Sequence, residues 1–174
     1  TSIGNYSFSG CSSLTNIKIP KSVSTIGESA FSDCSKLEEI NIPSSIITIG
    51  NASFKGCTSL ENITIPSSVT SIGNYAFNEC SSLKHIPSSV TTIVDGAFSD
   101  CSLLSNISIP SSVTIIKHAT FKNCISLTKI DIPSSITVIG EYSFYCCSSL
   151  IHITIPSSVT KIDNFAFNGC NSLK

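Results

Sequence analysis

The sequence predicts a solenoid, a fold in which one short unit repeats along an axis, and three residue types in a single register predict it. Proline recurs at Pro20, Pro43, Pro66, Pro87, Pro110, Pro133 and Pro156. Phenylalanine recurs at Phe8, Phe31, Phe54, Phe77, Phe98, Phe121, Phe144 and Phe167. Cysteine recurs at Cys11, Cys34, Cys57, Cys80, Cys101, Cys124, Cys147 and Cys170, the cysteine ladder. Because a fixed period of about 23 residues marks stacked repeats, residues 1–174 are expected to form one solenoid of about seven and a half units.

The elements of the unit follow from its local chemistry. Each unit opens with proline and, in most cases, two serines, which indicates a turn. A second short extended piece is expected in the V-T-x-I-G pattern that follows. The A-F-x-x-C pattern is long enough for about one helical or 3₁₀ turn. The stretch Leu60–Pro66 alternates with period two and ends at proline, as a short strand does. A continuous helix is excluded, because each internal proline would cost about 3 kcal/mol.

The L-x-x-I-x-I pattern resembles the strand half of a leucine-rich repeat, and A-F-x-x-C-x-x-L resembles the BspA-like, or treponemal, class of these repeats. The resemblance spans the whole chain. It implies a right-handed, β-dominated horseshoe of the α/β type, with a parallel sheet on the concave side and short extended or helical-turn segments on the other. It also implies a non-enzymatic role in surface adhesion or protein binding.

Stacked units place equal residues above one another, so each column of the repeat becomes a ladder. The leucine, isoleucine and valine columns are expected to fill the core, and the phenylalanines to stack. The cysteine ladder is expected to be buried and unpaired, since parallel Cβ directions oppose the disulfide dihedral. Cys146 lies outside this ladder and is expected to be exposed.

A glycine column holds Gly4, Gly27, Gly50, Gly73 and Gly140. Val94 occupies the same place in another unit, and a β-branched residue disfavours positive φ. We therefore expect this glycine to serve tight packing at a corner.

One unit, between Cys80 and Cys101, has 21 residues because Ile86 runs directly into Pro87. We expect a shortened strand and a local irregularity at residues 84–88. Neither end of the chain shows a polar capping unit, so we expect an excerpt of a longer array with neighbouring repeats at both ends. Such a fragment is expected to associate end to end or to fray.

Composition excludes several partners and activities. The formal net charge is −1, which disfavours nucleic acid, and no apolar run approaches the length of a membrane span, so no direct membrane insertion is expected. Glu38 and Glu39 should point to different surfaces without a pocket. The repeated serines are expected to bond turn backbone groups. The sequence therefore predicts no enzyme and no catalytic, cofactor or metal site.

The concave face, formed by the solvent-facing strand positions, is the candidate binding surface. It lacks aromatic residues and arginine, which favours weak, multivalent contact. Its candidate residues are Asn16, Lys18, Glu39, Asn41, Asn62, Thr64, Lys84, His85, Asn106, Ser108, Lys129, Asp131, His152 and Thr154.

Two functions remain open at this point. The resemblance favours a protein-binding or adhesion module of a cell-surface or secreted protein, with a protein or host-surface ligand. The alternative is a structural repeat of a larger intracellular or filament-forming assembly, which leaves a cytoplasmic location open. Sequons at Asn5, Asn51, Asn62 and Asn106 would carry glycans only in a eukaryotic secretory pathway.

Overall fold

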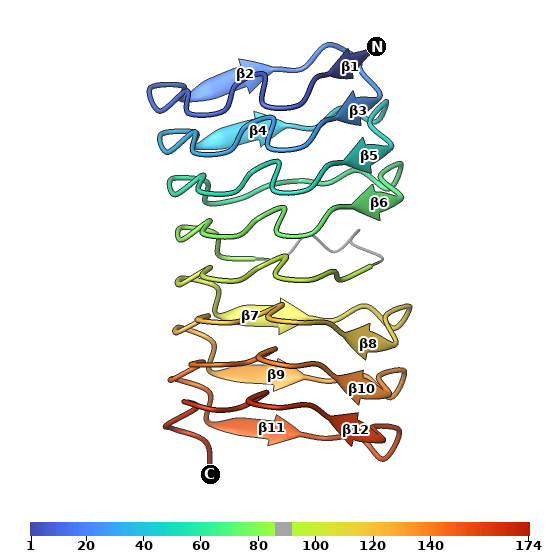
Figure 1. Ribbon diagram of the computed structural model, residues 1–174, viewed down its shortest axis with the longest axis vertical. Coiled ribbons are helices and arrows are strands. Elements are labelled where there is room, and N and C mark those ends of the chain that lie inside the picture. The colour runs from blue at the N-terminus through green and yellow to red at the C-terminus, as the bar shows by residue number, and fades with distance from the viewer. Residues whose placement is uncertain (86–91) are drawn as a thin grey trace.

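The computed structural model describes residues 1–85 and 92–174, which form a stack of coils along one axis (Figure 1). The L-x-x-I-x-I pattern supplies one set of short strands: β2 (Asn16–Lys18), β4 (Glu39–Asn41), β7 (Asn106–Ser108), β9 (Lys129–Asp131) and β11 (His152–Thr154). The V-T-x-I pattern supplies the other set: β1 (Ser2–Ile3), β3 (Thr25–Ile26), β5 (Thr48–Ile49), β6 (Ser71–Ile72), β8 (Ile115–Ile116), β10 (Val138–Ile139) and β12 (Lys161–Ile162).

All pairings between these strands are parallel, and each joins one coil to the next. Ile17 pairs with Ile40, for example, so partners lie one repeat apart in the sequence. The first set forms the sheets β2-β4 and β11-β9-β7, and the second forms β1-β3-β5-β6 and β12-β10-β8. The parallel solenoid is thereby confirmed.

The A-F-x-x-C segments do not form the expected helical or 3₁₀ turn, because the described residues contain no helix. The α/β type of horseshoe is therefore not confirmed. Each segment is a run of turns with two left-handed residues. In the first coil these are Tyr6, with φ of 58°, and Gly10, with φ of 73°. Ser7 donates its backbone N–H to Gly4 and Cys11 donates to Phe8, so each left-handed residue is third in its turn, as in type II. A left-handed residue every four positions prevents a right-handed helix.

The left-handed residues keep their conformation because the neighbouring coil binds them. Their N–H groups donate to carbonyl oxygens of the next coil, as Ala52 does to Asn74 at 2.9 Å and Cys146 to Asn168 at 2.8 Å. These bonds run along the stack beside the strand ladders, so the turn segments also join the coils.

The core consists of the predicted ladders. The phenylalanines stack with ring centroids 5.2 to 6.0 Å apart. Leu37, Leu60 and their equivalents up to Leu150 are fully buried. The two end coils are exceptions, because one side of each faces solvent: Ile162, expected in the core, is 49% exposed.

The glycine column serves close packing, as predicted, and none of its residues has positive φ. A Cβ added to Gly50 would lie 2.6 Å from the backbone carbon of Gly27 in the preceding coil, and one added to Gly73 would overlap the backbone nitrogen of Asn51. Real side chains do not approach backbone so closely, which explains glycine at these corners.

The cysteine ladder is unpaired, and its members from Cys34 to Cys147 are buried. Three details differ from expectation. Cys11 is exposed because it lies on an end coil, and Cys170, on the other, is half-buried. Cys146 is also half-buried. Each buried thiol donates to the carbonyl of the phenylalanine in the preceding coil, as Cys57 does to Phe31 at 3.2 Å.

The expected irregularity at residues 84–88 lies largely outside the described residues, which include only Lys84 and His85 of that stretch. The ring spacing in the phenylalanine ladder differs at the short unit. Its two widest spacings, 5.7 Å to Phe77 and 6.0 Å to Phe121, lie on either side of Phe98, which belongs to that unit.

Candidate binding surface

The concave face is built by alternation along the first set of strands. In β4 the middle residue, Ile40, is buried, whereas Glu39 and Asn41 on either side of it are exposed. The same pattern holds in β9, around Ile130. All candidate residues with a described side chain are exposed, and Asn106 lies in β7.

Parallel pairing places these side chains in columns across the coils. Asn16 lies beside Glu39 and Lys18 beside Asn41, while Lys129 lies beside His152 and Asp131 beside Thr154. The two halves of the face belong to separate sheets, β2-β4 and β11-β9-β7.

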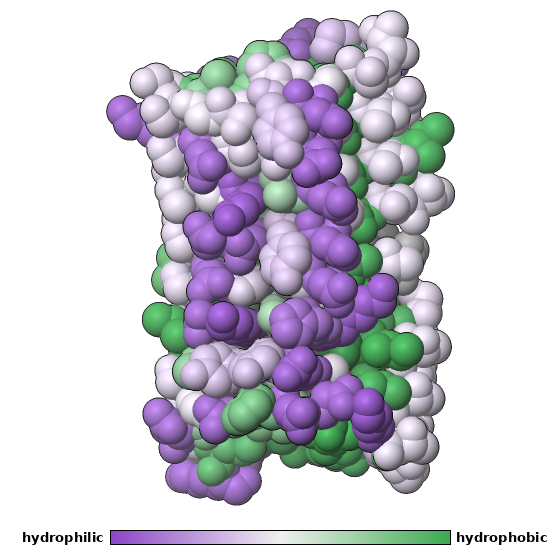
Figure 2. Space-filling view, viewed as in Figure 1, coloured by the Kyte–Doolittle hydropathy of each residue, from purple (hydrophilic) through white to green (hydrophobic). Residues whose placement is uncertain are grey.

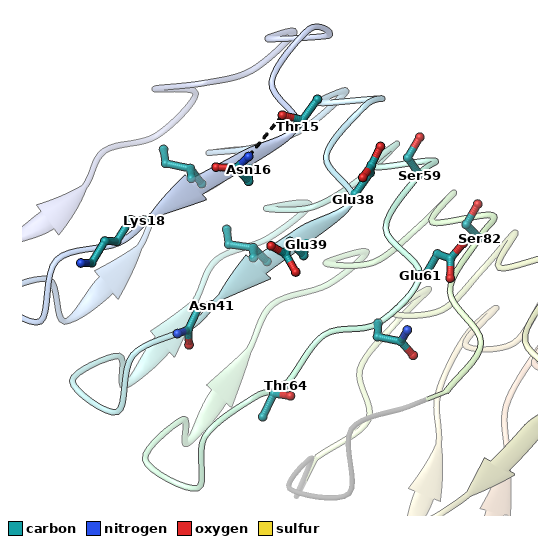
Figure 3. Close-up of a pocket in the computed structure, with 13 residues that line it drawn as sticks. Thr15, Asn16, Lys18, Glu38, Glu39, Asn41, Ser59, Glu61, Thr64 and Ser82 are labelled. Carbon is teal, nitrogen blue, oxygen red and sulfur yellow. Dashed lines mark hydrogen bonds between the residues drawn. The ribbon is translucent and has the colours of Figure 1, made fainter.

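The N-terminal half of the face is hollowed. A depression of roughly 1210 Å³ extends over the first coils, and its wall includes Asn16, Lys18, Glu39, Asn41, Asn62 and Thr64 from the candidate set. Figure 3 shows the labelled residues of this wall on β2, on β4 and on the following coil. Among the candidate residues with a described side chain, those from Lys84 to Thr154 do not line it.

The expectation for Glu38 and Glu39 is wrong, because both carboxylates line this depression. Strand alternation would separate them, but β4 begins at Glu39 and Glu38 precedes it. Strand alternation also does not predict the other rim residues that come before the exposed strand positions. Thr15, Ser59, Glu61 and Ser82 complete the rim, and no pattern inside the strand motif indicates them.

Charges on the concave face are partly paired. The Lys84 ammonium lies 2.7 Å from the carboxylate of Glu61, one coil away, and Lys129 lies 3.1 Å from Asp131 on the same strand. All four side chains are well exposed, so these pairs contribute little to stability. Glu38 and Glu39 also line the depression, and within the described part of the chain neither carboxylate has an ion-pair partner.

Several of the repeated serine hydroxyls donate hydrogen bonds to the backbone of the preceding coil. Ser68 donates to the carbonyl of Ile46 at 2.8 Å, Ser135 to Val113 at 2.7 Å and Ser158 to Ile136 at 2.7 Å. The expected hydroxyl ladder is thus confirmed at these positions. Within the described ranges, no three histidine, cysteine or acidic side chains gather as a metal site would require. No helix there is long and apolar enough to cross a bilayer.

Comparisons with known proteins agree with this architecture. A family model described as the BspA type leucine rich repeat region matches residues 1–103 and 84–174. A leucine-rich repeat protein of Eubacterium ventriosum is 32% identical over 90% of this chain, with a TM-score of 0.78. This chain spans 43% of that protein's length.

Two further solved structures are similar over nearly the whole chain. The Treponema pallidum leucine-rich repeat protein is 30% identical over 100% of this chain and 72% of its own, with a TM-score of 0.74. A leucine-rich repeat protein of Bacteroides ovatus is 30% identical over 99% of this chain and 69% of its own, with a TM-score of 0.65. No match was found among curated protein sequences.

Proposed function

Since the chain belongs to the BspA-type leucine-rich repeat family, we propose that it is a non-enzymatic protein-binding or adhesion module of a cell-surface protein. The ligand contacts the concave face. The observation that carries the proposal is the burial pattern of strands β4 and β9. In each strand the middle side chain is buried in the core, and the side chains on either side of it project into solvent.

The chemistry of this face favours many weak contacts over one tight one. Amide, hydroxyl and carboxylate groups line the depression, and the candidate set contains no aromatic side chain or arginine. Binding hot spots are rich in tryptophan, tyrosine and arginine, which this face lacks. Affinity therefore has to come from many weak contacts repeated from coil to coil.

The test is adhesion of beads coated with the 174-residue chain to epithelial cell monolayers. We expect adhesion to fall at least fivefold for the double variant Glu39→Arg and Asn41→Arg, and to fall when the cells are first treated with trypsin. The matched control is Glu79→Arg, an exposed carboxylate on a turn segment outside the depression. All variants should keep the parental circular dichroism spectrum and melting temperature.

Adhesion that is unchanged by the double variant would overturn the concave face as the contact surface. Absence of any adhesion above that of uncoated beads would leave the structural-repeat alternative as the better account.

A further inference from the structure

A second cluster of side chains lies on the turn face, formed by the outward-pointing residues of the turn segments. Tyr142 is its centre. The Phe165 ring stacks on it with centroids 5.1 Å apart and an interplanar angle of 12°, and the Tyr145 ring meets it edge-on at 5.4 Å. His118 makes a second edge contact at 5.8 Å. Eight of the nine phenylalanines belong to the core ladder, and Phe165 is the ninth.

The fold does not require aromatic rings at these positions. The column that holds Tyr142 and Phe165 contains Ser29, Ala52 and Ala119 in other coils, and single tyrosines at Tyr6 and Tyr75. Figure 2 shows a narrow column of weakly polar and apolar residues that runs lengthwise between two hydrophilic columns. This arrangement agrees with the residue types that the repeat places on the turn face. Alanine or serine satisfies the architecture at each of these places.

The backbone also disfavours large side chains here. Tyr142 has φ of 55° and Phe165 has φ of 57°, in the left-handed region. Bulky residues are uncommon in this conformation. In this column Tyr142 and Phe165 are the two rings on neighbouring coils, at a place where Ala52 and Ala119 show that the fold accepts alanine.

The cluster is open to solvent and bears a positive charge. Phe165 is 53% exposed, and Tyr142 and Tyr145 are half-buried. The Lys122 ammonium lies 5.9 Å from the centroid of the Tyr145 ring, and it has no carboxylate within ion-pair distance in the described part of the chain. Glu141, the nearby acid, lies 3.8 Å from His118 instead.

We propose that Tyr142, Tyr145, Phe165 and Lys122 form a second protein-docking site, which binds an acidic partner segment carrying an aromatic side chain beside a carboxylate. The partner ring packs on the exposed rings, and the partner carboxylate pairs with the Lys122 ammonium. Tyrosine is enriched in binding hot spots, and the lysine over the Tyr145 ring adds a charge that selects for anions. This site lies off the concave face and does not depend on the function proposed for that face.

The test is an amide chemical-shift titration of the isotope-labelled 174-residue chain with three acetylated, amidated tripeptides: Glu-Phe-Glu, Lys-Phe-Lys and Glu-Ser-Glu. We expect Glu-Phe-Glu to shift amides in residues 118–123, 141–146 and 164–168, with a dissociation constant at least fivefold lower than for either other peptide. Equal affinity for Lys-Phe-Lys, or shifts confined to other segments, would overturn the proposal. So would equal shifts from methyl β-galactoside, which would indicate a carbohydrate site.

Matched variants separate docking from folding. Tyr142→Ala should weaken Glu-Phe-Glu binding at least fivefold, whereas Tyr75→Ala, in the same column but outside the cluster, should leave it unchanged. Lys122→Gln should weaken Glu-Phe-Glu at least threefold and leave Lys-Phe-Lys unaffected. Unchanged binding in both Tyr142→Ala and Lys122→Gln would contradict the assignment. Each variant is to be compared at its own folded fraction, measured by thermal unfolding.

Discussion

The thiol of Cys80 donates a hydrogen bond to the backbone carbonyl of Phe54 in the preceding coil, with a sulfur–oxygen distance of 3.1 Å. The bond joins the cysteine ladder to the phenylalanine ladder. It recurs from Cys34 to Cys170, so the sulfur atoms act as backbone partners as well as small apolar groups.

Thiol labelling should follow exposure along the ladder. With a maleimide at neutral pH we expect Cys11 to react first, Cys146 and Cys170 next, and the buried thiols only after unfolding. Peptide mass mapping over time measures the order. Labelling of Cys80 as fast as Cys11 would contradict it.

Stability should fall at alkaline pH. Burial raises the pKa of the Cys34 thiol from 9.0 to about 11 and that of Cys147 to about 12. Between the ordinary thiol pKa of 9.0 and the raised pKa of each buried thiol, the unfolded chain loses protons that the folded chain keeps. The free energy of unfolding therefore decreases as pH rises through this range. Urea denaturation should give constant stability below about pH 8 and a progressive loss from about pH 9 to 11. A Cys34→Ala variant should show a shallower loss.

Substitution in the glycine column should depend on the neighbouring coil. Gly50→Ala would place its Cβ 2.6 Å from backbone, so we expect a loss of about 1–3 kcal/mol in the free energy of unfolding. Gly4→Ala is the matched control, because its added Cβ meets only the Ser7 hydroxyl, at 3.3 Å. Equal losses in the two variants would refute the packing explanation.

Removal of one buried hydroxyl should stabilise the chain. Ser143 is fully buried and its Oγ has no hydrogen-bond partner. Alanine fills the same column at Ala76 and Ala166, so Ser143→Ala should raise the free energy of unfolding by about 1 kcal/mol. In the same column Thr120 donates to Lys117 at 2.9 Å, so Thr120→Ala should lower it. Chemical denaturation of both variants gives the comparison.

Spacing alone predicts the interior of this fold well. A residue that recurs every 23 positions has to occupy the same place in each coil, so the ladders and the exposed strand positions follow directly. The turn conformation does not follow, because Tyr142, Ser29 and Ala52 have no preference for the left-handed region that they occupy. The local signals of that region are Gly10, Gly56, Gly96 and Gly169, together with Asp33 and Asn123, which tolerate it.

The candidate surface divides in the same way. Alternation identifies Glu39 and Asn41 as exposed, because it depends only on which neighbours are buried. The depression was not predictable, since its rim includes Glu38, which precedes β4, and Ser59, which precedes the strand motif. How far a loop side chain reaches over a sheet depends on the path of the chain.

The bonds between coils come from the strands, the turn segments and the thiols, and all of them join one coil to a neighbouring coil of the stack seen in Figure 1. A pull on the two ends of the chain therefore loads all the interfaces in series, and coils are expected to peel away singly from the ends. Every released coil adds about 80 Å of extended chain, given about 3.5 Å per residue. Under tension the solenoid is expected to lengthen in steps of this size, each at modest force, and so to behave as a mechanical damper between whatever its two ends are joined to.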